Sequence, residues 1–227
     1  MQHVSEYYQH LPDANSIPAR LAAYQRRRMF QRFTSAFGTD PGQTIVDVGV
    51  TSNEAYELDN FFEVLYPNKS AITAIGLEDG SHLEVKYPGL RFVRVPVGPL
   101  PFGDDHFDLA HSSAVIEHVG NRKNQVGFLR ELWRVARRGI FVTTPNRWFP
   151  VEFHTILPLA HWLPPAVFRA LLRGIGHDFY AQEANLNLMS SNDMRNTARE
   201  AGVTNFRIEM VRLGPWSSNL LLIARKG

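Results

Sequence analysis

Short apolar runs alternate with helix-like stretches between residues 44 and 144, and this alternation constrains the fold more than any other feature of the sequence. The apolar runs predict strands at 44–48, 71–77, 91–95, 107–111 and 140–144. The clearest helix is predicted over 124–138, where large apolar side chains recur at spacings of three and four. Strands separated by helical crossovers run parallel in one sheet. The sequence therefore predicts an α/β fold with a doubly wound, mostly parallel sheet.

The N-terminal part predicts a separate segment. Residues 1–17 are polar and mixed and predict a loose arm, and Pro18 favours the first turn of a helix over 19–37. Gly38 is a typical helix stop. We therefore expect two units, an N-terminal arm and helix over 1–38 and a main domain over 39–227.

The C-terminal part predicts the edge of the sheet. A helix is expected over 191–201, followed by strands over 205–213 and 219–224. Five residues between these strands suit a hairpin, which turns one strand antiparallel to the rest. With the five strands before it, the hairpin gives a seven-stranded sheet.

Residues 146–189 interrupt the alternation after the fifth strand. They are rich in aromatic residues and histidines and contain four prolines, which break any long helix. We predict an insertion that forms a mobile lid over the carboxyl end of the sheet. Its large apolar side chains must be buried against something, and the position of the segment favours burial against a ligand. These groups are Trp148, Phe149, Phe153, Ile156, Leu157, Leu159, Trp162 and Leu163.

Composition excludes several classes of protein. The chain has no cysteine, which rules out disulfides and thiolate metal sites, and its nine histidines form no helical metal-binding pair. We therefore predicted no metal site. A net charge of +2 is too mild to predict a nucleic-acid partner. Because no signal-like segment and no apolar stretch of about 20 residues occur, we expect a soluble cytoplasmic protein.

Candidate ligand-binding residues follow the predicted strands. In an open α/β sheet, ligands bind beyond the carboxyl ends of the strands, near the point where strand order reverses. Glycine allows a ligand to approach the backbone there, and a carboxylate can accept two hydrogen bonds from a ribose diol. The residues at these places are Asp47, Val48, Gly49, Ser52, Glu78, Asp79, Val97, Ser112 and Ser113, with Glu117 and His118 shortly after the fourth strand.

These places resemble a known family. The run Ile45-Val46-Asp47-Val48-Gly49 is similar to the first motif of class I methyltransferases. Leu100-Pro101-Phe102, Phe107-Asp108-Leu109, the run from Ser112 to His118, and the later Phe128-Leu129-Arg130-Glu131-Leu132 resemble the small-molecule methyltransferases grouped as type 11. The resemblance covers about residues 40–147. It implies a Rossmann-like methyltransferase fold ending in an antiparallel strand, with S-adenosylmethionine as cofactor and methyl transfer as the activity.

The sequence departs from the family pattern in three places. Residues 50–53 replace the second and third glycines of the first loop. Gly76 stands where the ribose-binding acid usually ends the second strand, so the resemblance transfers that role to Glu78, two residues on. No acid precedes Leu100, which leaves the adenine to main-chain groups around Val97, to Asp79 or to apolar packing.

Methyl transfer requires the acceptor atom to be held in line, and a hydroxyl acceptor must also lose its proton. His118 and then His154 are the predicted general bases. We expect a small-molecule or lipid-linked acceptor, methylated at oxygen or nitrogen, with peripheral membrane contact allowed. The sequence does not predict the oligomeric state.

Two alternatives remain open at this stage. One is a degenerate methyltransferase-like domain that serves as a binding or scaffold subunit, because the first loop is atypical. The other is a dinucleotide-dependent oxidoreductase, although the Gly-x-Gly-x-x-Gly loop that would bind its pyrophosphate is missing.

Overall fold

The computed structural model describes residues 16–52 and 58–227. Residues 1–15 of the arm predicted over 1–17 lie outside the described residues. No helix in the described ranges is both long enough and apolar enough to cross a bilayer.

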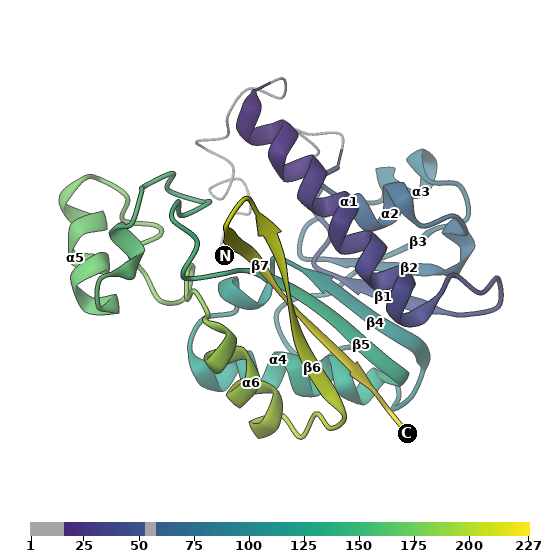
Figure 1. Cartoon of the computed structure of the whole chain (residues 1–227). Coiled ribbons are helices and arrows are strands. Elements are labelled where there is room, and N and C mark those ends of the chain that lie inside the picture. The colour runs from purple at the N-terminus through teal and green to yellow at the C-terminus, as the bar shows by residue number, and fades with distance from the viewer. Residues whose placement is uncertain (1–15, 53–57) are drawn as a thin grey trace.

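Seven strands form one sheet in the order β3-β2-β1-β4-β5-β7-β6 (Figure 1). Strands β1 to β5 are parallel to one another, whereas β7 is antiparallel to both β5 and β6. The expectation of a mostly parallel sheet with one antiparallel strand is thus confirmed. The strands are β1 (Ile45–Val48), β2 (Ile72–Gly76), β3 (Arg91–Arg94), β4 (Phe107–Ser113), β5 (Ala136–Pro145), β6 (Phe206–Leu213) and β7 (Trp216–Arg225).

Helices cover both faces of this sheet (Figure 1). One buried apolar cluster joins α1 and α2 to the sheet, and a second joins α4 and α6 to its opposite face. The helices are α1 (Ile17–Phe37), α2 (Phe61–Leu65), α3 (His82–Lys86), α4 (Arg122–Val135), α5 (Pro165–Gly174) and α6 (Ser191–Glu200). Short 3₁₀ turns lie at η2 (Lys69–Ala71), η3 (Ile116–His118) and η4 (Ala160–Trp162).

Helix α1 begins and ends as its sequence predicts. The Ser16 side chain accepts a hydrogen bond from the Ala19 amide, and Pro18 occupies the first turn. Gly38 follows the last residue with φ +74°, and its amide donates to the Thr34 carbonyl. The buried stripe of α1 includes Phe33, which packs among rings from α2 and β5.

One predicted boundary is wrong. The helix expected over 124–138 with Gly139 as its stop ends at Val135, and Gly139 lies within β5, opposite Arg225 of β7. A Cβ at Gly139 would lie 2.3 Å from the Ala224 carbonyl oxygen. The glycine therefore permits close approach of two strand backbones rather than a helix end.

The insertion at 146–189 is compact and has its own core. A parallel bridge between Asn146 and Met189 closes its base. It contains η4 and α5, and in Figure 1 α5 stands to one side of the sheet. The helix was hidden in the sequence by prolines, yet Pro165 occupies its first turn, where proline is tolerated. The core residues are Phe168, Leu172, Tyr180, Ala181 and Leu186.

Candidate active site

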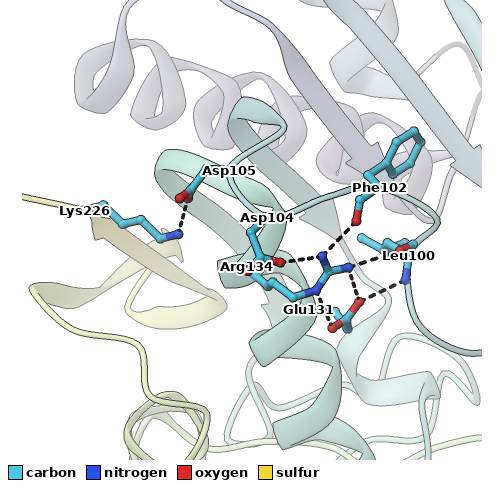
Figure 2. Close-up of polar contacts among 7 residues, drawn as sticks. All are labelled: Leu100, Phe102, Asp104, Asp105, Glu131, Arg134 and Lys226. Carbon is cyan, nitrogen blue, oxygen red and sulfur yellow. Dashed lines mark hydrogen bonds and ion pairs between the residues drawn. The ribbon is translucent and has the colours of Figure 1, made fainter.

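The segment between β3 and β4 is held in place by helix α4 (Figure 2). The Arg134 guanidinium donates to the carbonyls of Leu100 and Phe102 at 3.1 and 2.8 Å, and Glu131 accepts from the Leu100 amide at 3.0 Å. Glu131 and Arg134 also pair with each other at 2.8 Å, which lowers the pKa of the Glu131 carboxyl. Helix α4 therefore fixes the loop between β3 and β4. This contact explains why the Leu-Pro-Phe run and the later Glu131 and Arg134 belong to one motif.

The turn after β1 packs against the turn after β4. The Gly49 amide donates to the Ile75 carbonyl at 2.8 Å, and the residue has φ +105°, a conformation that side-chain-bearing residues rarely adopt. A Cβ at Gly49 would lie 2.1 Å from Cγ2 of Val115. Asn60 fixes Thr51, two residues after Gly49, by exchanging two hydrogen bonds with its backbone. The loop geometry therefore requires glycine at position 49.

Glu78 lies where the sequence expected the ribose-binding acid. It is half-buried at the end of β2, and the Ser52 hydroxyl donates to its Oε2 at 3.0 Å, which joins the loops after β1 and β2. Asp79 is exposed and accepts from the Ser81 amide, and that hydrogen bond lowers its pKa. Val97 is 86% exposed. Of the two acids, Glu78 is the one that faces the first loop.

Three of the predicted cofactor residues use their side chains inside the protein. The Asp47 carboxylate lies 2.7 Å from Nδ1 of His111 on β4, deep below the strand ends. The Ser112 hydroxyl is fully buried and donates to the carbonyl of Val48 at 2.7 Å, while Ser113 bonds the Thr143 hydroxyl at 2.8 Å. Val48 itself is buried. Asp47 and Ser112 thus shape the site through the backbone that they fix.

Asp47 belongs to a sealed polar cluster that also contains His111 of β4 and Glu63 of α2. Burial raises the pKa of Asp47 to about 7 and lowers that of His111 to about 3. Burial, and then the neighbouring Asp47, raise the pKa of Glu63 well above its usual value. The cluster is therefore kept largely uncharged by protons held on its acids. Sequence analysis missed Glu63, because nothing in its helix distinguishes it from a solvent-facing acid.

A second polar cluster, with one side open, lies at the carboxyl ends of β4 and β5. Thr144 donates to Glu117 Oε2 at 2.8 Å, and the rings of His118 and His154 lie 4.6 Å apart, edge to face. The Asn187 amide of the insertion donates to the Glu117 carbonyl, so the insertion is tied directly to this cluster. The structure thus brings together His118 and His154, the two histidines predicted to act on the acceptor.

The cluster sets the two histidines apart in basicity. Burial, and then the nearby His154, lower the pKa of His118 to about 3. Burial also acts to lower the pKa of His154, but the charge and hydrogen bond of Glu152 outweigh it and raise that pKa. Burial raises the pKa of Glu117 to about 7. Sequence analysis missed Glu152, whose place two residues before His154 was the available signal.

Comparison with known proteins identifies this arrangement of strands and loops. A family model described as a methyltransferase domain matches residues 46–143, the stretch from β1 to β5. Over these residues the chain is similar to methyltransferase domains. No curated protein matches this chain by sequence.

Solved structures share the fold of this chain over most of its length. A SAM-dependent methyltransferase from Aquifex aeolicus is 14% identical with a TM-score of 0.57, over 92% of this chain and 93% of that one. A Mesorhizobium loti S-adenosylmethionine-dependent methyltransferase is 16% identical with a TM-score of 0.57, over 87% and 97%. A Synechocystis magnesium protoporphyrin IX methyltransferase, solved with bound SAH, is 14% identical with a TM-score of 0.55, over 98% and 92%.

The residues of this chain fit S-adenosylmethionine, which supplies an electrophilic methyl group on a sulfonium. Glu78 offers a half-buried carboxylate for the ribose hydroxyls, and Gly49 keeps the first loop free of a side chain. The segment around Val97 lies at the end of β3, braced below by Arg134. These groups come from three neighbouring strands, as expected for a ligand at the switch point between β1 and β4.

Proposed function

We propose that this methyltransferase modifies an oxygen or nitrogen of a small molecule with an apolar body, in the cytoplasm. The observation that carries the proposal is the cluster of Glu117, His118 and His154. It follows the cofactor-side turn through Val115, whose side chain contacts Gly49, and it lies under the insertion. A polar cluster in that position suits the reacting end of an acceptor.

The insertion supplies the apolar side of the proposed acceptor pocket. Trp148, Phe153 and Leu159 are 49%, 40% and 49% exposed although they are large and apolar. Such a surface favours burial against a ligand or a lipid surface. We therefore propose that the insertion closes over a free or lipid-linked acceptor, and no nucleic-acid partner is proposed.

For a hydroxyl acceptor, we propose the two predicted bases in the reverse order, with His154 before His118. Neutral His118, with its lowered pKa, is a weak proton acceptor. His154 is supported by Glu152, whose Oε1 lies 2.7 Å from its Nδ1 and raises its pKa. In the protein without other ligands, His154 is the stronger candidate.

The proposal is tested by incubating the protein with methyl-labelled S-adenosylmethionine and panels of phenols, amines, carboxylic acids and lipid-linked sugars. Label should enter a small molecule from the panel. Label found only in protein or nucleic acid would overturn the proposed acceptor class. Calorimetry with S-adenosylhomocysteine and NAD provides the binding readout, and NAD binding alone would favour the oxidoreductase alternative.

Glu78→Ala provides the matched cofactor-site variant. An unpaired buried partner costs about 1–3 kcal/mol, so S-adenosylhomocysteine affinity should fall about tenfold or more. Asp79→Ala is the control and should bind as the parent does. Cofactor binding with no transfer to any class of acceptor would favour the scaffold alternative.

A further inference from the structure

Three potential ligand atoms converge between the end of β4 and the insertion. One carboxylate oxygen of Glu117 and one ring nitrogen from each of His118 and His154 all lie within 4.8 Å of one another. Glu117 is fully buried, and its Oε1 has no hydrogen-bond partner within the described part of the chain. A buried acceptor atom without a partner is costly, so its position calls for a cation or a donor that completes it.

The surroundings of both histidines orient the rings toward this point. Nδ1 of His118 lies 2.7 Å from the carbonyl oxygen of Asn185, which can only accept, so that nitrogen is the donor. Nδ1 of His154 lies 2.7 Å from Glu152 Oε1. A neutral imidazole that donates through Nδ1 carries its lone pair on Nε2. Both rings are therefore held in the tautomer that offers Nε2 as a ligand.

A hydrogen bond from the second ring nitrogen to a carbonyl or carboxylate is the usual outer support of a metal-bound histidine. Here both histidines have it, and Glu117 has an equivalent brace because Thr144 holds its other oxygen at 2.8 Å. The supporting groups come from β5 and from two places in the insertion. A polar cluster that is only buried does not need supporting hydrogen bonds from several separate elements.

We propose that Glu117, His118 and His154 bind a divalent transition-metal ion such as Zn²⁺ or Mn²⁺ and leave further coordination positions open. Two imidazole nitrogens and one carboxylate oxygen suit these ions, whereas Mg²⁺ prefers oxygen ligands alone. Glu117 Oε1 and His118 Nε2 lie 3.9 Å apart. Ligand atoms around a tetrahedral zinc ion lie about 3.4 Å apart, so small side-chain rotations complete the site.

This site goes beyond the proposed methyl transfer, because the ion binds to side chains of this chain and needs neither the cofactor nor the acceptor. With the ion bound, an acceptor oxygen takes an open position and becomes more acidic. His154 then acts as a ligand and no longer as the proton acceptor. The long separation in sequence explains why no spacing motif revealed the site, because His154 lies 36 positions after His118.

The test is a titration of metal-stripped protein with Co²⁺ and Zn²⁺, followed by calorimetry and by the visible absorption of Co²⁺. One equivalent should bind, with an absorption band typical of nitrogen and oxygen ligands. Glu117→Gln and His154→Gln should each lower the affinity at least tenfold, and Glu152→Gln should lower it about 10- to 100-fold through loss of the outer support. His177→Gln, a histidine outside the cluster, is the matched control.

Absence of stoichiometric binding to the parent protein would overturn the proposal, as would unchanged affinity in both Glu117→Gln and His154→Gln. Circular dichroism identifies any variant that fails to fold, and the parent's Co²⁺ spectrum remains decisive in that case. None of these readouts uses methyl transfer. A parent protein that binds neither Co²⁺ nor Zn²⁺ but still methylates an acceptor would overturn this site and leave the proposed function intact.

Discussion

Two buried clusters of carboxylates and histidines lie at different depths in this protein, one between β1, β4 and α2 and the other beyond the end of β4. The deeper cluster joins Asp47, Glu63 and His111, and the ring of His111 stacks on Phe62 at 4.2 Å. The shallower cluster joins Glu117, His118 and His154, whose histidine side chains remain 17% and 15% exposed. Burial perturbs pKa values in both. Only in the shallower cluster do the histidine side chains remain partly exposed, so accessibility and not the pKa shift is the reason that we propose a function for that cluster alone.

Replacement of Asp47 should give the largest loss of stability. Asp47→Ala removes the 2.7 Å partner of His111 and leaves a cavity among tightly packed rings. We expect unfolding free energy to fall by about 3 kcal/mol, from an unsatisfied polar group and lost packing together. Urea unfolding measures it, with Asp47→Asn as the milder control. A loss below about 1 kcal/mol would show that the deep cluster does not support the core.

Gly49 lies between the two clusters, two residues after Asp47 and against Val115. Gly49→Ala forces a Cβ to within 2.1 Å of Val115 Cγ2 at φ +105°. We expect destabilisation of about 2 kcal/mol and weaker S-adenosylhomocysteine binding. Gly42→Ala, where a Cβ would meet nothing within 4 Å, is the control. Parent-like thermal stability and affinity in Gly49→Ala would show that this turn can rearrange freely.

Replacement of Glu63 should reveal the protons of the deep cluster. The raised pKa of Glu63 means that the folded protein keeps a proton that the unfolded chain releases. The free energy of unfolding therefore falls as pH rises above the usual pKa of 4.5. His111, with its lowered pKa, acts in the opposite direction between about pH 3 and 6.5. Glu63→Gln should therefore gain stability relative to the parent between pH 5 and 8, by at most about 1.4 kcal/mol per pH unit for one proton. Melting temperatures that differ by a constant amount across this range would contradict the assignment.

The smallest effect on stability is expected at the shallower cluster. Burial raises the pKa of Glu117 to about 7, so the charged carboxylate is costly to hold in the fold without a cation. In metal-free buffer, Glu117→Gln should change unfolding free energy by less than about 1 kcal/mol at pH 5, and its gain over the parent should grow between about pH 4.5 and 7, where only the carboxyl of the unfolded chain is charged. A loss as large as that of Asp47→Ala would place Glu117 among the structural residues.

The same comparison explains what could be predicted from the sequence. The alternation of apolar runs indicated the strands, and the structure has His118 and Glu78 just beyond the carboxyl ends of β4 and β2, as expected. Asp47 was assigned to the cofactor because its position in the strand does not reveal which residue lies beside it in the sheet. In the fold it pairs in register with His111, which lies 64 positions away. A contact at that separation depends on strand order, which a local pattern does not contain.

The insertion was predicted by composition but not in its internal form. Its prolines concealed α5, since one of them begins the helix rather than breaking it. Likewise, the contact between Glu152 and His154 is local, but its meeting with Glu117 requires the chain to return over β5. Local elements could therefore be predicted from the sequence, whereas the set of residues that meet at the proposed acceptor site could not.

The closed base of the insertion has an evolutionary consequence. Residues 146–189 leave and rejoin the domain at one bridge between Asn146 and Met189 and fold around a core of their own. Mutations inside that core can accumulate without disturbing the strands that hold the cofactor. Under the proposed function, a lineage can thus change its acceptor by exchanging this one segment, and a graft cut at those two residues should transplant acceptor preference between proteins that share the same scaffold.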